Sequence, residues 1–151
     1  MNKYQHTLEK LENNTAKRSI ALVIEGALIG ILAGLTAVLY RYCLTYAESG
    51  LYAVLNFIRG NAGVTALWFA ALILMGCIVA KIAKWEPMAA GSGIPQVSGE
   101  VRGYLDQSFW RVILAKFTGG TLSIFGGLSL GREGPSIQLG AMVAKSYSRL
   151  R

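Results

Sequence analysis

Long apolar stretches alternate with polar ones along the chain, and their lengths are those of membrane helices. Residues 20–40 form a mostly apolar run that would rise about 31 Å as a helix, which matches a hydrocarbon core of about 30 Å. Residues 62–80 carry no charge and form a second spanning candidate. Between them, residues 41–61 are expected to be irregular or interfacial, with Tyr40 and the tyrosines that follow it in the headgroup zone. The pattern of residues 1–18 predicts a short amphipathic helix on the membrane surface.

The second half of the chain is also apolar, but it is broken twice. Residues 86–107 contain two prolines and several glycines, so this stretch is too short and too interrupted to span a bilayer. A third apolar run covers residues 109–130, and residues 135–150 are expected to form one more helix. These patterns predict an all-α, multi-pass membrane protein with broken, re-entrant helices.

Small residues recur at every fourth position in two of the apolar runs. The first strip comprises Gly26, Gly30 and Gly34, and the second comprises Gly119, Ser123, Gly127 and Gly131. In lipid, such strips allow a second helix to approach closely. They therefore predict a tightly packed bundle rather than a lone membrane anchor.

The distribution of basic residues predicts how the chain is oriented. Four basic residues lie in residues 1–18, two lie in residues 41–61, and five lie between Lys81 and Lys116. The excess of Lys and Arg marks the cytoplasmic side. We therefore expect the N-terminal segment 1–18 in the cytoplasm, residues 41–61 outside, and the chain from Lys81 onward inside again.

The two broken places share a design that favours anion binding. "AGSGIPQ" at residues 90–96 and "GREGPSIQ" at residues 131–138 each place a glycine-containing turn before a proline at the expected first helical position. The first turn of a helix leaves N–H donors unpaired, and the helix dipole adds partial positive charge there. Two such helix starts facing one pocket would hold an anion.

Specific side chains at these breaks suit that role. The Ser92 hydroxyl can donate a hydrogen bond without adding a fixed charge, which keeps binding moderate. Glu133 carries a carboxylate that can itself occupy an anion site when ionised and leave it when protonated. The candidate anion-binding residues at the two breaks are Ser92, Gly93, Ile94, Arg132 and Gly134. Taken singly, each motif is also compatible with an ordinary loop or a surface turn.

Composition supports the membrane class and excludes several others. The chain of 151 residues is 53% hydrophobic and 15% charged, whereas soluble domains carry about 25% charge. Its net charge of +7 comes from basic residues that flank apolar runs, so we do not expect nucleic-acid binding. No catalytic constellation, metal-ligand spacing or phosphate-binding motif occurs, and we expect neither enzyme activity nor a metal site nor a cofactor.

The sequences "GSGIP" at 91–95 and "GREGP" at 131–135 resemble the two signature sequences of the CLC family of chloride channels and chloride/proton antiporters. The segment "FWRVILAKFTGG" at 109–120 is similar to the family segment between them. The resemblance implies that residues 19–151 are part of the first CLC repeat. It also implies that Ser92 binds the central anion and that Glu133 gates the pathway. Lys116 would add positive potential near the pathway, or would instead extend to the cytoplasmic interface.

The resemblance further implies that chloride is the transported ligand and that protons are exchanged for it in a full-length parent. The resemblance also implies that the full-length parent is a homodimer in the plasma (cell inner) membrane. The chain lacks the later "GxFxP"-type signature and the inner proton-transfer glutamate of the family. A passive chloride channel and a non-transporting, truncated membrane fragment therefore remain alternatives.

Overall fold

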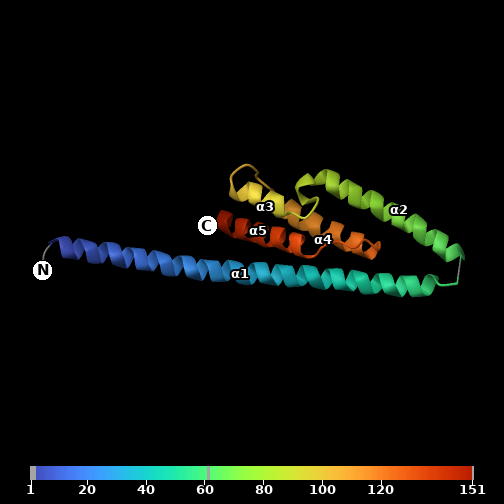
Figure 1. The fold of residues 1–151 in the computed structure, drawn as a ribbon, viewed down its shortest axis with the longest axis horizontal. Helices are drawn as coiled ribbons and strands as arrows, with labels where there is room; N and C mark the ends of the chain where they lie inside the picture. The colour runs from blue at the N-terminus through green and yellow to red at the C-terminus, as the bar shows by residue number, and fades with distance from the viewer. Residues whose placement is uncertain (1–2, 61, 151) are drawn as a thin grey trace.

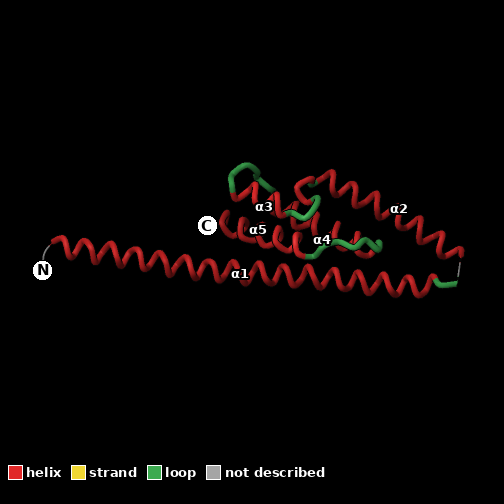
Figure 2. The backbone as a smooth tube through the Cα atoms, in the orientation of Figure 1, coloured by secondary structure: helices red, strands yellow, loops and turns green. Residues whose placement is uncertain are grey.

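The computed structural model describes the backbone of residues 3–60 and 62–150, and every regular element in these residues is a helix. The elements are α1 (Lys3–Ile58), α2 (Ala62–Trp85), the short 3₁₀-helix η1 (Pro87–Ala89), α3 (Ile94–Val101), α4 (Phe109–Phe125) and α5 (Glu133–Leu150). Helix α1 extends along one side of the molecule, α4 and α5 pack against it, and α2 packs against α4 (Figure 1). The loops that join α2, α3, α4 and α5 in turn lie on the same side of α1 as these helices (Figure 2).

Helix α1 is continuous, so the prediction of an irregular segment at residues 41–61 was wrong up to Ile58. This region contains no proline, and its buried residues recur at helical spacing: Tyr40, Leu44 and Ala47. Tyr40, which we had expected in the headgroup zone, is 2% exposed. The packing of this stripe against α4 and α5 keeps the segment helical where the sequence alone had indicated a break.

The helix predicted at residues 62–80 is confirmed as α2, a candidate membrane span, and it extends five residues beyond the predicted end. Its 24 residues rise about 36 Å, enough to cross a bilayer. In the described part of the chain, α2 and the stretch Arg18–Ile58 of α1 are the helices long and apolar enough to span. Their most apolar windows are unburied within the chain, as surfaces that contact lipid would be.

The first glycine strip does not form a helix contact in this structure. An added Cβ at Gly26, Gly30 or Gly34 would have nothing within 4 Å. The partly buried residues of this half of α1 lie one position earlier and include Ile29 and Ala33. The prediction that this strip packs against another helix was therefore wrong for the described residues, because the packed stripe is offset by one position.

The close approach of α4 to α1 occurs at Gly120, next to the second predicted strip. A Cβ at Gly120 would lie 2.4 Å from Tyr40 Oη, whereas one at Gly119 would lie 3.8 Å from Ile82 Cγ2. The ring of Tyr40 meets Phe117 edge-on, with centroids 5.2 Å apart. The buried core that forms around this contact comprises Tyr40, Leu44, Ala47, Ile124 and Leu139.

Helix starts and ends differ from the sequence predictions by a few residues. Helix α4 ends at Phe125 instead of residue 130, because Gly126 and Gly127 follow and Gly127 adopts a φ of +88°. Helix α5 begins at Glu133, so Pro135 is its third residue, and α3 begins at Ile94, so Pro95 is its second. Both prolines still lie in the first turn, where a missing N–H leaves no intrahelical bond unmade.

Candidate functional site

The two broken places lie directly against each other. A Cβ added to Gly134 would come 2.5 Å from the carbonyl oxygen of Ser92 and 2.9 Å from its Cβ, so only glycine allows this approach. Helices α3 and α5 contact one another and run in the same direction from this point (Figure 1). Their N-terminal ends therefore meet at one place, as the sequence predicted.

A cavity of about 490 Å³ opens beside this contact. Its walls are mostly apolar and come from α1, α2 and α4, with Tyr40 and Ile82 among them. The polar side chains in its lining are those of Tyr40, Ser92, Lys116 and Ser123. A few polar groups in an apolar concavity are the usual arrangement of a small-ligand site.

Lys116 turns its ammonium towards the first break. The residue is 5% exposed, and its Nζ donates a hydrogen bond of 2.7 Å to the carbonyl oxygen of Gly91. The alternative in which Lys116 extends to the membrane interface therefore does not describe this structure. An ammonium has three donors, and this bond is the one recorded for Lys116 among the described residues. Its remaining N–H groups are available to a further acceptor in the cavity.

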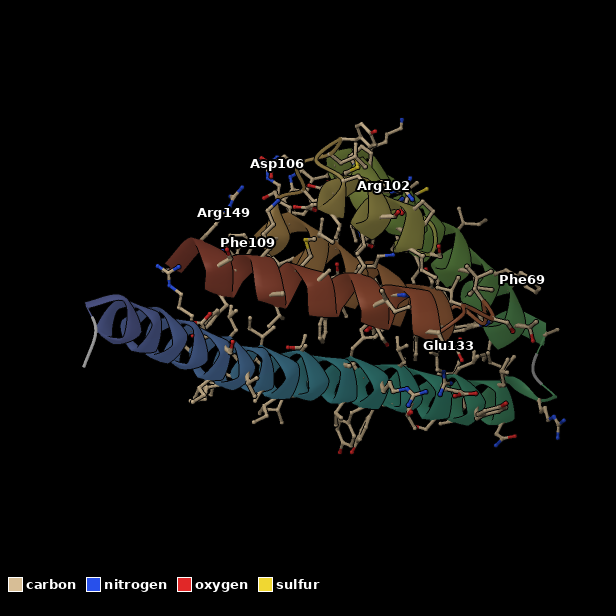
Figure 3. All side chains as sticks on the ribbon, turned by 60° about the vertical axis from the view of Figure 1, so that its left-hand side comes forward. Phe69, Arg102, Asp106, Phe109, Glu133 and Arg149 are labelled. Atoms are coloured by element: carbon tan, nitrogen blue, oxygen red, sulfur yellow. The ribbon has the colours of Figure 1, made fainter. Side chains whose placement is uncertain are left out.

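Arg132 and Glu133 lie beside the cavity and do not line it. The Arg132 guanidinium pairs with Glu48 of α1, with 2.5 Å between Nη2 and Oε2. Glu133 is exposed at the start of α5, close to α1 (Figure 3). Sequence reasoning missed Glu48, although its spacing of four from the buried Leu44 could have placed it on the packed stripe.

Gly93 and Ile94 also lie outside the cavity lining. Gly93 is buried and caps α3 with a φ of +85°, a backbone conformation that residues other than glycine rarely adopt. A Cβ there would lie 2.3 Å from Gln138 Oε1. Ile94 is 48% exposed. In the first break, Gly91 and Ser92 face the cavity, while Gly93 faces a glutamine that sequence reasoning did not select.

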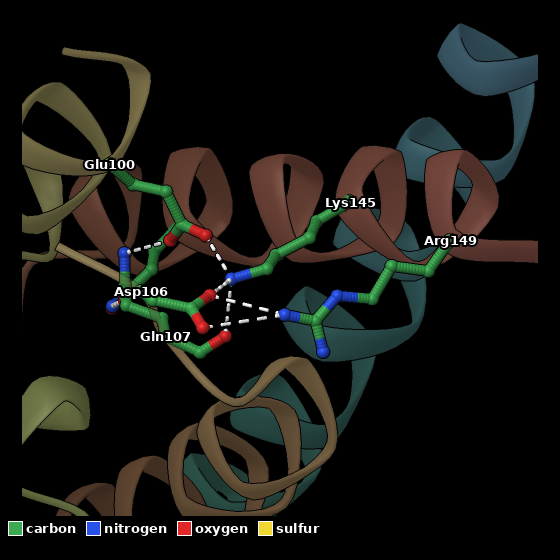
Figure 4. Close-up of polar contacts among 6 residues, drawn as sticks. Glu100, Asp106, Gln107, Lys145 and Arg149 are labelled. Atoms are coloured by element: carbon green, nitrogen blue, oxygen red, sulfur yellow. Dashed lines mark hydrogen bonds and ion pairs between the residues drawn. The ribbon is translucent and has the colours of Figure 1, made fainter. Parts of the chain in front are cut away.

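A charged cluster joins the loop after α3 to the C-terminal half of α5 (Figure 4). Lys145 Nζ donates to Glu100 Oε1, to Asp106 Oδ1 at 2.5 Å and to the Gln107 carbonyl at 2.6 Å. Arg149 Nη2 lies 3.1 Å from the same Asp106 oxygen. The hydrogen bond from Lys145, together with its charge, lowers the pKa of the Asp106 carboxyl. The cluster fastens this loop to α5 away from the cavity.

Known proteins match most of the chain. A family model described as voltage gated chloride channel matches residues 70–151. The chain is 31% identical over 132 residues to the H(+)/Cl(-) exchange transporter ClcA of Vibrio campbellii, a match that covers 84% of this chain. It is 32% identical over 131 residues to the ClcA of Vibrio vulnificus, with 83% of this chain covered. It is 32% identical over 141 residues to the ClcA of Vibrio cholerae, with 87% covered.

The matches cover much less of these relatives: 28% of the first, 27% of the second and 29% of the third. The chain thus spans under a third of their length. The family match covers more than half of the chain and includes the second half of α2 and all of α3, α4 and α5. It also contains both broken places and the whole contact between Ser92 and Gly134. The chain therefore belongs to the voltage gated chloride channel family, as an all-helical membrane protein.

Proposed function

We propose that this chain forms one wall of a chloride pathway and that the anion occupies the cavity beside Ser92 and Gly134. The single observation that carries the proposal is the contact between these two residues at the rim of one cavity. This contact brings the starts of α3 and α5 together beside the cavity, where the positive ends of both helix dipoles favour an anion.

Each group near the cavity has a distinct part in the proposal. The Ser92 hydroxyl donates a neutral hydrogen bond to the anion, and the backbone near Gly134 supplies further donors. Lys116 contributes positive potential from a buried position, which strengthens its effect on a nearby charge. Since most of the wall is apolar, these groups hold the anion moderately, as conduction or exchange requires.

Glu133 is the proposed gate and proton carrier. It is exposed and precedes Gly134, which lines the cavity, in the first turn of α5. In the proposed cycle, its side chain rotates to bring the carboxylate to the cavity rim. An ionised carboxylate competes with chloride for the helix donors, whereas a protonated one does not. Binding of a proton and binding of chloride would thereby be coupled.

For the whole protein to which such a chain contributes, we propose exchange of chloride for protons in a cell membrane, with the N-terminus in the cytoplasm and a homodimeric assembly. The similarity to proteins named H(+)/Cl(-) exchange transporters supports this choice over a passive channel. No cofactor takes part in the proposed cycle. The same similarity favours a transporter over an enzyme.

Two measurements test the proposal separately. Isothermal titration of the purified 151-residue chain with chloride, against gluconate as the inert anion, should give binding that Ser92→Ala weakens. Ser98→Ala removes a hydroxyl from α3, the helix that follows the Ser92 loop, away from the cavity, and should leave the binding unchanged. Absence of chloride binding by the unaltered chain would overturn the proposal.

Chloride efflux from proteoliposomes then tests transport. Efflux that loses its pH dependence in Glu133→Ala supports the gate. Chloride binding without efflux supports the alternative of a non-transporting membrane segment, which binds the anion but does not complete a pathway.

A further inference from the structure

A buried chain of hydrogen bonds connects the first broken place to the charged cluster. Gln138 of α5 is fully buried, and its Nε2 donates to the Met88 carbonyl at 2.8 Å and to Gln107 Oε1 at 2.6 Å. Gln107, which is 1% exposed, donates in turn to Glu100 Oε2 at 2.7 Å. Glu100 accepts from Lys145.

The two acceptors fix the orientation of the Gln138 amide. Both of its N–H donors are used, one by a backbone carbonyl and one by a side chain that is itself held by Glu100. Its Oε1 has no hydrogen-bond partner among the described residues and lies against Gly93. The position of the Gln138 amide is thus set by the Met88 carbonyl, by Gln107 and by the close contact with Gly93.

These contacts fall on both flanks of the loop that carries Ser92. Met88 precedes the loop and Gly93 follows it, and Gln138 touches both. Gly134 and Gln138 are four residues apart, so they lie on the same face of α5 one turn from each other. Gly134 contacts Ser92, and Gln138 contacts Gly93. Two successive residues before α3 therefore pack against two successive turns of α5.

We propose that Gln138 is a positioning residue that fixes the loop at residues 90–92 against α5 and so sets where Ser92 stands relative to the anion. The inference rests on the proposed function for its consequence, but the position it assigns to the loop can be measured without chloride. The side chain does not line the cavity and acts through Met88 and Gly93. The Gln138 amide is also held by Gln107, which is bonded to Glu100, and Glu100 in turn accepts from Lys145.

The test is hydrogen–deuterium exchange of the purified full chain in detergent, followed by mass spectrometry of peptides that cover residues 88–94. Gln138→Met keeps the length of the side chain and removes both donors, so exchange in these peptides should rise roughly tenfold or more. Ser136→Ala is the control, because it removes a bond to the Arg132 carbonyl just before α5 and none to the loop that carries Ser92. Unchanged exchange of residues 88–94 in Gln138→Met would overturn the inference.

A second variant keeps the test decisive if Gln138→Met does not fold. Gln107→Met leaves the bond from Gln138 to Met88 and frees the other end of the amide, so exchange should rise by a smaller factor. No rise with Gln107→Met in a folded chain would also count against the inference.

Repeating the exchange with chloride separates this inference from the proposed function. If chloride slows exchange of residues 88–94 in the unaltered chain, Gln138→Met should raise the chloride concentration needed for half of that protection, which a general loss of stability in α5 would not do. Faster exchange in Gln138→Met without any effect of chloride would uphold the positioning role and overturn the proposed anion site.

Discussion

Gly134 lies so close to Ser92 that a methyl group at position 134 would come 2.5 Å from the Ser92 carbonyl oxygen. The obstructing atom belongs to the backbone, so it cannot rotate away as the end of a long side chain could. Both residues also line the same cavity. The starts of α3 and α5 can thus lie this close together only because residue 134 has no side chain.

Gly134→Ala should separate the two helix starts. We expect a loss of about 1–3 kcal/mol in unfolding free energy, the usual cost of overpacking, together with weaker chloride binding. Thermal unfolding in detergent and chloride titration measure the two effects. The control is Gly140→Ala on the same helix, where the new Cβ would meet Ala33 Cβ at an ordinary 3.6 Å. If both variants bind chloride as the unaltered chain does, the contact has no part in the site.

Gly120→Ala should destabilise the packing of α4 on α1, because the added methyl group would lie 2.4 Å from Tyr40 Oη. We expect a loss of about 1–3 kcal/mol, and Tyr40→Phe in the same chain should restore part of it by removing the obstructing oxygen. Gly119→Ala, one residue earlier, meets only Ile82 at 3.8 Å and should stabilise the helix by up to about 1 kcal/mol. Equal melting temperatures for the two alanine variants would contradict this packing.

Glu48→Gln should release the Arg132 guanidinium and strengthen anion binding. The two side chains are 37% and 40% exposed, and exposed ion pairs contribute up to about 1 kcal/mol. That figure corresponds to at most about fivefold in Kd, which chloride titration can resolve. A Kd that does not change would show that Arg132 acts only as a structural partner of α1. Glu48→Lys should push Arg132 away and lower the melting temperature, in contrast to the neutral variant.

Acid should weaken the bond between Asp106 and Lys145. The lowered pKa of Asp106 means that its stabilising effect is complete above the ordinary unfolded value of about 3.9 and is lost as pH falls through the folded value. The melting temperature should therefore hold between about pH 7 and 5 and fall below about pH 4. Asp106→Asn should reduce that fall. The difference in melting temperature between the unaltered chain and this variant gives the contribution of Asp106 separately from that of Glu100. A melting profile that Asp106→Asn leaves unchanged would contradict the assignment.

The spacing of proline and glycine predicted the place of the two breaks and their meeting better than it predicted the helix ends. Proline is tolerated anywhere in the first turn, so Pro95 and Pro135 mark a helix start only to within one or two residues. Glycine every fourth residue permits close packing but does not require it. The strip at Gly26 therefore faces outward, while the true contact at Gly120 depends on the one large ring, Tyr40, that reaches it.

The residues that sequence reasoning missed are those whose partners are far away in the chain. Glu48 pairs with Arg132 across 84 positions, and Gln138 bonds to Met88 across 50. A glutamine in a mostly apolar helix carries no motif, so only the fold reveals that it touches both flanks of the Ser92 loop. Tyr40 was placed at the membrane surface because the sequence could not show that α4 offers a glycine opposite its hydroxyl.

Helix α1 is a single rod of 56 residues, about 84 Å long, and the bilayer interior is only about 30 Å thick. The apolar run 20–40 cannot change tilt without moving Tyr40 and Glu48, since α1 is one continuous helix through both residues. A thinner or thicker membrane that tilts this rod would therefore shift one wall of the cavity and the partner of Arg132 together. Lipid composition would in this way change the shape of the proposed anion site.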